Sequence, residues 1–206
     1  MDVSKIAADP IDRAKAIFRQ NGGMLRMSAA IQAGIHRDTL RKMIGRGDLH
    51  KVSRGLYQLV EALPPSHPDL AVVGAKVPEG VICLISALSF HELTTQIPHE
   101  VYLAINRNAE PPRISYPPVR VFRFSGKAFT EGIETHDVGP VVVRIYSREK
   151  TLADCFKYRN KVGLDTCREA LELYKQQRRY NVEAILKYAS ICRVAKVIRP
   201  YLEAIL

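Results

Sequence analysis

Basic side chains recur at helical spacing within AGIHRDTLRKMIGRGDLHKVSRGLYQL, residues 33–59. Arg41 and Lys42 fall with Asp38 on the outward side of the helical wheel, and Arg37 lies at its N-terminal shoulder. The other side is apolar, and its expected inward residues are Leu40, Met43 and Ile44. A guanidinium can bridge O6 and N7 of guanine with two hydrogen bonds, and both kinds of cation pair with phosphates. These residue types predict an amphipathic helix whose polar side contacts duplex DNA.

Two shorter helices are expected before this one. Pro10 and Asp12 are start signals for the first, and Gly22-Gly23 stops it. The second occupies RMSAAIQAG and ends at Gly34. After the third helix, DLHKVSRGLYQLV predicts two short strands around a Ser-Arg-Gly turn. This order is typical of winged helix-turn-helix domains, in which the second helix braces the third in a major groove about 12 Å wide.

The hairpin is expected to carry Lys51 and Arg54 toward the neighbouring backbone or minor groove. A basic amphipathic helix can also be a solvated surface that binds nothing. The combination of three helices, glycines at the turns and a basic hairpin favours DNA binding. The candidate DNA-binding residues are Arg37, Asp38, Thr39, Arg41, Lys42, Arg46, Lys51, Ser53 and Arg54.

The charge distribution supports this prediction. The formal net charge is +10, and the first 60 residues hold eleven Lys and Arg against five Asp and Glu, which gives +6. The other 146 residues hold 20 against 16, which gives +4. Positive charge attracts polyanions without specifying a fold. Because the excess lies in the segment with the helical pattern, nucleic acid is the expected partner.

Composition limits the class of protein. The 206 residues are 47% hydrophobic and 25% charged, an ordinary globular balance for one large domain or two small ones. No apolar run approaches the roughly 18 residues of a membrane span, and MDVSKIAADP lacks a secretory signal, so a cytoplasmic protein is expected. The four cysteines show no Cys-x-x-Cys spacing and are expected to be buried free thiols: Cys83, Cys155, Cys167 and Cys192.

Prolines mark a boundary in EALPPSHPDL, residues 61–70. The predicted domains are residues 1–62, which bind DNA, and residues 63–206. The second domain should begin with a short helix at Asp69 and continue with a helix near Ser86. Strands are expected in EVYLAIN and VRVFRFS, and a hairpin in IETHDVGPVVVRIYS with its turn at Val138-Gly139-Pro140.

From Ser147 onward the pattern is helical. Ser147 should cap a helix that Gly163 stops, and a second helix should follow in LDTCREALELYKQQ. Asn181 should cap the last helical segment, which Pro200 should kink or restart. The predicted fold class is therefore α+β: an N-terminal winged helix-turn-helix domain, then a small, mostly antiparallel sheet and a helical bundle.

Motifs for catalysis are incomplete. HELTT, residues 91–95, begins like a zinc-binding helix but has Thr95 where a second histidine is required. ISALS lacks the glycines of a nucleophile elbow, and no P-loop is present. Three carboxylates could serve a two-metal nuclease only by elimination: Asp137, Glu149 and Asp154. No catalytic residue, metal site or cofactor is predicted.

The segment SREKTLADCFKYRNKVGLD has a second basic pattern. Lys150, Asp154, Lys157 and Lys161 share a predicted helical face opposite Leu152, Cys155 and Phe156. One interpretation is a solvated face with lysine–aspartate pairs worth a few tenths of a kcal/mol each. The other is a basic surface for a partner, made by Lys150, Lys157 and Lys161. The pattern alone leaves both open.

Three segments together resemble the AbiEi-type antitoxins: GIHRDTLRKM with KVSRGLYQL, PPSHPDLAVVGAKVPEGVICLISALSFHELTTQIPHEVYLAI, and YSREKTLADCFKYRNKVGLD. The resemblance spans roughly residues 10–205. It implies a transcriptional regulator of a type IV toxin–antitoxin module, linked to abortive phage infection, that binds inverted repeats in its own promoter. It also implies a C-terminal domain required for antitoxicity and a nucleotidyltransferase-like toxin, with no stable complex required. No catalytic residue is implied.

Two other classes stay open. One is a stand-alone winged-helix repressor whose second domain senses a ligand or partner, which a downstream nucleotidyltransferase gene would argue against. The other is a nuclease or nucleotide-modifying enzyme guided by the DNA-binding domain. Metal-dependent turnover that is lost on changing Asp137, Glu149 or Asp154 would support that class.

Overall fold

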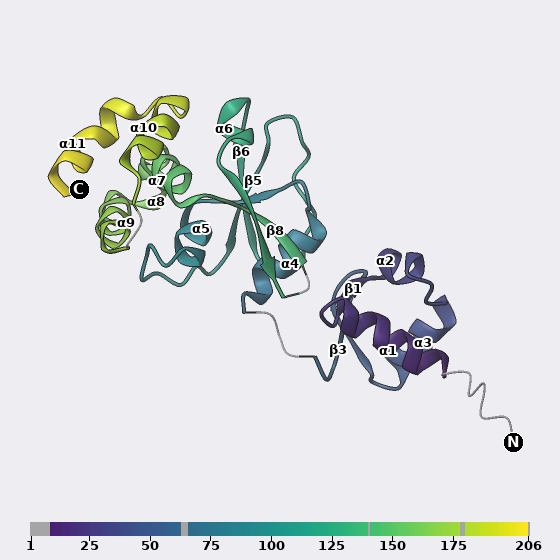
Figure 1. The fold of residues 1–206 in the computed structure, drawn as a ribbon. Helices are drawn as coiled ribbons and strands as arrows, with labels where there is room; N and C mark the ends of the chain where they lie inside the picture. Colours follow the sequence, from purple (N-terminus) through teal and green to yellow (C-terminus); the bar gives the residue numbers. More distant parts are fainter. Residues whose placement is uncertain (1–8, 63–65, 140, 178–179, 206) are drawn as a thin grey trace, which may run out of the picture. The chain divides into compact units, whose positions relative to one another are not determined.

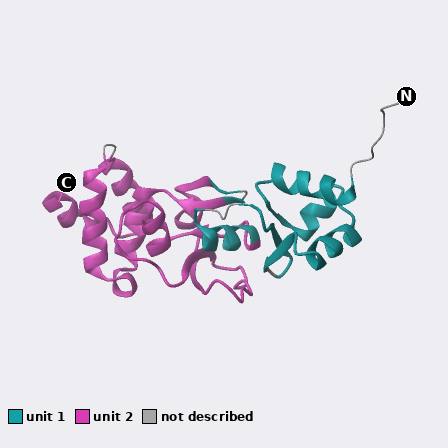
Figure 2. Cartoon of the chain, turned by 90° about the horizontal axis from the view of Figure 1, so that it is seen from below, with its two compact units in different colours: residues 1–75, 137–142 teal, residues 76–136, 143–206 magenta. Residues whose placement is uncertain are grey.

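The computed structural model describes residues 9–62, 66–139, 141–177 and 180–205. The chain divides into two compact units, coloured separately in Figure 2. Unit 1 comprises residues 1–75 and 137–142, and unit 2 comprises residues 76–136 and 143–206. The expected boundary prolines Pro64 and Pro65, and Pro140 of the expected hairpin turn, lie outside the described residues.

Unit 1 begins with three helices and a three-stranded sheet (Figure 1). Their bounds are α1 Pro10–Gln20, β1 Met24–Arg26, α2 Met27–Gln32, α3 Arg37–Gly45, β2 Leu49–Ser53 and β3 Leu56–Leu59. The sheet is antiparallel in the order β1-β3-β2. The three helices and the hairpin are confirmed. The sequence prediction missed β1, because three residues are too few to show an alternating pattern.

The core of this part of unit 1 is formed by one side of each helix. Phe18, Ala30, Leu40 and Met43 are almost completely buried there. Ile44, expected to face inward with them, is 36% exposed. A helix with 3.6 residues per turn aligns residues 40 and 43 on the core, and the next position turns toward solvent.

Gly23 allows the chain to turn closely between α1 and β1. Its φ is +84°, and a Cβ at this position would lie 2.4 Å from the Cβ of Ala62. Its amide donates to the carbonyl of Phe18 at 2.7 Å. The expected stop at Gly22-Gly23 is confirmed, and Gly23 is required both for its backbone conformation and for its lack of a side chain.

The helix expected at Asp69 is α4, Pro68–Lys76. Within unit 1, Val72 of this helix forms a small buried cluster with Met24 and Leu56.

Unit 2 contains most of a five-stranded sheet. Its strands are β4 Val81–Ile82, β5 Val101–Asn106, β6 Val119–Phe124, β7 Ile133–Val138 and β8 Val141–Tyr146, in the order β6-β5-β4-β8-β7. The expected strands and hairpin are present. The prediction of a mostly antiparallel sheet was wrong, because β5 pairs with β6 in parallel and β4 pairs with β8 in parallel. The connection between β5 and β6 is long enough to return the chain for parallel pairing.

Helices gather beside this sheet toward the C-terminus (Figure 1). Their bounds are α5 Leu84–Phe90, α6 Lys127–Thr130, α7 Arg148–Lys157, α8 Arg159–Val162, α9 Leu164–Gln176, α10 Val182–Ile191 and α11 Ala195–Ile205. The expected caps are confirmed, since Ser147 Oγ accepts from the Lys150 amide and Asn181 Oδ1 accepts from the Ala184 amide. Pro200 lies inside α11. The helical segment is interrupted earlier than expected, between α10 and α11, where Arg193 has a φ of +59°.

Candidate nucleic-acid interface

In unit 1, α2, a tight turn and α3 together form a helix-turn-helix. Gly34 turns the chain with a φ of +90°, and Ile35 is buried after it. His36 caps α3, because its ring Nδ1 accepts a hydrogen bond from the Asp38 amide at 3.3 Å. These contacts fix where α3 begins, and burial of Leu40 and Met43 fixes which side faces the core.

The opposite side of α3 presents cations to solvent. Arg37, Arg41 and Lys42 are all exposed. Arg41 lies 3.4 Å from Asp38, and these two side chains are 79% and 64% exposed. A pair so well solvated contributes little to stability, so Arg41 can exchange Asp38 for a phosphate at small cost. No carboxylate of the described residues lies within 4 Å of Arg37 or Lys42.

Arg46 lies beside a carboxylate where α3 joins β2. Its Nε is 3.4 Å from Asp48 Oδ2, while Lys15 of α1 is 2.7 Å from Asp48 Oδ1. The hydrogen bond from Lys15, followed by the charges of Lys15 and Arg46, holds the pKa of Asp48 below its ordinary value despite some desolvation. Asp48 therefore ties α1 to the start of the hairpin and partly neutralises Arg46.

Thr39 differs in position from the other candidates on α3. It is half-buried and lines a shallow pocket of about 160 Å³ with Ala14 and Ile17 of α1. Its side chain therefore lies on the flank of α3 that faces α1.

The β2–β3 hairpin presents Lys51 and Arg54, and both are exposed. Gly55 turns the chain with a φ of +75°, and the register shifts between Lys51 and Ser53. Nothing is described for the side chain of Ser53. The sequence prediction did not include two exposed histidines, His36 and His50, which could also donate hydrogen bonds to phosphate. Their sequence signal is their position directly before α3 and within the basic hairpin.

The predicted basic surface of Lys150, Lys157 and Lys161 does not exist as such. Lys150 is completely buried, and its Nζ lies 2.5 Å from Oδ2 of the equally buried Asp154. Lys157 and Lys161 are exposed but belong to different helices, because α7 ends at Lys157. The i, i+4 pair was expected in solvent, but it lies on the side of α7 that packs into the core of unit 2.

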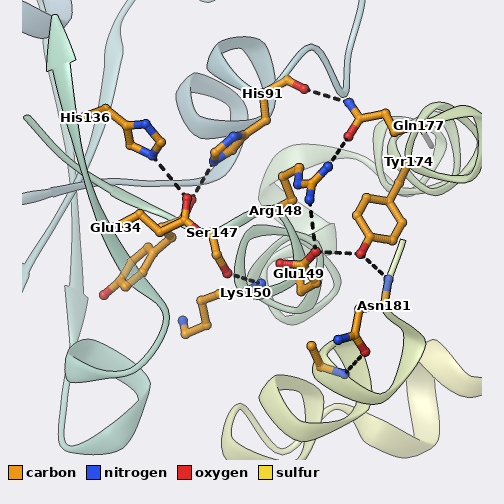
Figure 3. Close-up of polar contacts among 12 residues, drawn as sticks. His91, Glu134, His136, Ser147, Arg148, Glu149, Lys150, Tyr174, Gln177 and Asn181 are labelled. Carbon is orange, nitrogen blue, oxygen red and sulfur yellow. Dashed lines mark hydrogen bonds and ion pairs between the residues drawn. The ribbon is translucent and has the colours of Figure 1, made fainter. Parts of the chain in front are cut away.

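Aromatic rings and a thiol surround this buried pair. The ammonium lies 4.2 Å from the ring centroid of Tyr146 and 5.1 Å from that of Phe124, and Cys192 Sγ donates to Asp154 Oδ1 at 3.1 Å. Figure 3 shows Lys150 among neighbouring polar contacts. Burial raises the pKa of Asp154, and the nearby ammonium of Lys150 only partly opposes this.

Two of the other residues considered for catalysis, His91 and Glu149, are engaged in the fold. His91 Nε2 donates to the carbonyl of Tyr146 at 2.8 Å, and burial lowers the pKa of His91. Glu149 accepts a hydrogen bond from the Tyr174 hydroxyl at 2.6 Å (Figure 3). Asp137 is exposed. Across the described ranges, no three His, Cys, Asp or Glu side chains group in a way that could hold a metal ion.

Two further expectations concern the whole chain. The four cysteines are free and buried, as predicted, and burial raises the pKa of Cys167 and of Cys192 to about 12. Within the part of the chain that the structure describes, every helix is too short or too polar to cross a bilayer.

Comparison with known proteins relates part of unit 1 to a family of regulators. The model of a family described as "Transcriptional regulator, AbiEi antitoxin" matches residues 12–60, which run from α1 to the end of β3. The resemblance to AbiEi-type antitoxin regulators is confirmed over this segment. The AbiEi match supports a transcriptional regulator of toxin–antitoxin systems, and the matched residues contain the exposed cations of α3 and the hairpin.

The AbiEi match does not extend into unit 2, but a similarity of fold does. The crystal structure of the RV2827C protein from Mycobacterium tuberculosis resembles this chain with a TM-score of 0.59 at 14% sequence identity. The similarity covers 94% of this chain and 79% of that chain, so the two proteins share a fold across both units. No curated protein matches the sequence significantly.

Proposed function

We propose that this chain is a DNA-binding transcriptional repressor and the antitoxin of a type IV toxin–antitoxin module. In this proposal residues 1–62 are a winged helix-turn-helix domain that binds inverted repeats in its own promoter, and residues 63–206 provide antitoxicity. The functional partner is a nucleotidyltransferase-like toxin, and no stable complex is required. The protein acts in the cytoplasm, where its promoter is, without catalysis or a cofactor.

One observation carries the DNA-binding part. The cations of α3 are exposed on the side opposite Leu40 and Met43, inside the segment that matches AbiEi regulators. A helix braced in this way can enter the major groove, where arginine reads guanine. The antiparallel β2–β3 hairpin, with Lys51 and Arg54, supplies a wing for phosphate contacts. We assign DNA binding to Arg37, Arg41, Lys42, Lys51 and Arg54, with Arg46 at the edge.

Two assays test the proposal. The first measures binding of the full chain to a duplex of its own promoter against a scrambled duplex of equal length. Tighter binding to the promoter supports the repressor, and equal binding contradicts it. The second co-expresses the chain with the product of the adjacent gene and scores growth. Restored growth supports the antitoxin, whereas repression without restored growth would indicate a stand-alone repressor.

A further inference from the structure

A small pocket lies between α1 and the start of α3. Its volume is about 160 Å³, which is below the range of about 300–1,000 Å³ typical of sites that enclose a whole small molecule. The buried residues Ala14 and Ile35 belong to its lining, together with three side chains that can donate hydrogen bonds: Arg13, His36 and Thr39. A recess of this size and composition suits one polar group of a larger ligand.

Arg13 brings a charge without a partner to the pocket. Its side chain is exposed, and no carboxylate of the described residues lies within 4 Å of it. The two other cations of α1 are already paired, Lys15 with Asp48 at 2.7 Å and Arg19 with Glu61 at 2.6 Å. Arg13 can therefore bind an external anion without giving up an ion pair.

His36 and Thr39 add neutral donors beside this charge. His36 Nδ1 accepts from the Asp38 amide at 3.3 Å, so in the neutral ring the N–H is on Nε2. The side chain of His36 is 77% exposed, which leaves this N–H open to a ligand. Within the described ranges, neither this N–H nor the Thr39 hydroxyl has a hydrogen-bond acceptor. The pocket thus combines one cation with two uncommitted donors.

The position of the pocket on α3 indicates which group would occupy it. Thr39 and Lys42 are three residues apart and share one flank of the helix. An α-helix with its side chains is about 10–12 Å across, and the major groove is about 12 Å wide. When the outward side of α3 lies in the groove, its flanks therefore face the phosphate backbones. The pocket lies on the flank that bears Thr39, where α1 adds Arg13.

We propose that this pocket, here called the α1–α3 pocket, holds one backbone phosphate of the DNA duplex. This inference rests on the proposed DNA-binding function and gives α1 a direct contact with DNA besides its packing against α3. Arg13 supplies the charge, and the His36 ring and the Thr39 hydroxyl donate to the phosphate oxygens. All three residues lie within the segment that matches AbiEi transcriptional regulators. The contact fixes the register of α3 in the groove and reads no base.

Fluorescence anisotropy of the full chain on promoter and scrambled duplexes, at several salt concentrations, tests this site. Arg13→Ala should weaken binding to both duplexes about tenfold and should decrease the slope of log affinity against log salt by about 0.9. Arg13→Lys should restore the slope, because either cation neutralises the phosphate. Arg19→Ala, which removes a paired cation of the same helix, is the matched control and should change neither quantity.

Two further variants test the neutral donors. His36→Ser keeps a capping oxygen for α3, and Thr39→Val keeps the shape of the side chain. Each should weaken binding to both duplexes about threefold without changing the slope, because a neutral donor releases no counterion. The melting temperature of every variant should equal that of the unchanged chain. If Arg13→Ala acts as expected while these two variants bind normally, Arg13 contacts DNA outside the pocket and the proposal is wrong.

The source of the phosphate is tested separately. Uncharged methylphosphonate linkages, introduced one at a time across a half-site, should include one that weakens binding of the unchanged chain but not that of Arg13→Ala. Excess inorganic phosphate, compared with chloride at equal ionic strength, should leave the melting temperature of the free chain unchanged. A rise in melting temperature that Arg13→Ala abolishes would assign the pocket to a free anion and overturn the proposal.

The remaining failures are distinguishable. If the unchanged chain binds neither duplex, the proposed DNA-binding function itself fails. If it binds DNA with a steep salt dependence, and Arg13→Ala keeps both affinity and slope, the pocket holds no phosphate and the DNA-binding function stands. If Arg13→Ala weakens binding to the promoter alone, Arg13 reads a base, and a phosphate contact is excluded.

Discussion

The ammonium of Lys150 and the carboxylate of Asp154 form an ion pair that is completely buried in unit 2. They stand one turn apart on α7, between the sheet residues Tyr146 and Phe124 and the thiol of Cys192. A buried pair can contribute little net stability, yet removing one partner leaves a charge without compensation. Removing one partner should therefore cost far more stability than replacing both partners with apolar side chains.

Lys150→Met should lower the free energy of unfolding by about 3–5 kcal/mol, because it leaves Asp154 buried without its cation. The double variant Lys150→Met/Asp154→Leu should recover most of that loss. Urea denaturation at pH 7 measures both. Lys157→Met, at an exposed residue of the same helix, is the control and should change stability by less than about 0.5 kcal/mol. A double variant as unstable as the single one would show that the charges themselves are needed.

Gly23→Ala should destabilise the protein more than Gly47→Ala does. Both glycines have positive φ, +84° and +78°, and an alanine in that region costs about 1–2 kcal/mol. Only at Gly23 would the new Cβ also meet Ala62, whereas nothing lies within 4 Å at Gly47. Adding Ala62→Gly should restore part of the loss in the Gly23 variant and none in the Gly47 variant. Equal destabilisation of the two single variants would contradict the contact.

Asp48 should make unit 1 sensitive to acid. Its pKa is depressed below 3.8 in the folded chain, chiefly by the hydrogen bond from Lys15. The stability it contributes is therefore fully present above pH 3.8 and is lost as the pH falls through the folded value. The melting temperature, followed by circular dichroism between pH 7 and pH 2.5, should be lower for Asp48→Asn at neutral pH. This difference should shrink in the most acidic samples, and a constant difference would refute the assignment.

Changes in α3 and in the hairpin should separate sequence reading from phosphate contact. Arg41→Ala should weaken promoter binding by about 1–3 kcal/mol if a base contact is lost, with a smaller effect on scrambled DNA. Arg54→Ala should weaken both duplexes about equally, because phosphates carry no sequence information. Fluorescence anisotropy measures both affinities. Arg19→Ala is the control, since Arg19 already pairs with Glu61 at 2.6 Å. If Arg41→Ala leaves promoter affinity unchanged, α3 does not read bases.

Local signals allowed much of unit 1 to be predicted. Helix starts and stops in the sequence located α1, α2 and α3, and the Ser-Arg-Gly turn located the hairpin. β1 could not be found locally, because its strand character depends on pairing with β3. The match to AbiEi regulators confirmed the resemblance over the same segment.

Unit 2 shows where sequence patterns are insufficient. Lys150 and Asp154 have the spacing of a solvated pair, and only the packing of α7 against the core reveals that they are buried. The parallel pairing of β5 with β6 likewise depends on how the connection between them runs.

If exposed cations of unit 1 bind promoter DNA, that binding should depend steeply on salt concentration. Affinity of the full chain should fall linearly with salt on logarithmic axes, with a slope of about 0.9 for each phosphate neutralised. In Arg37→Ala/Lys42→Ala, binding should weaken and the slope should decrease by about 1.8 if each cation neutralises one phosphate. An unchanged slope and affinity in this double variant would show that Arg37 and Lys42 do not contact DNA.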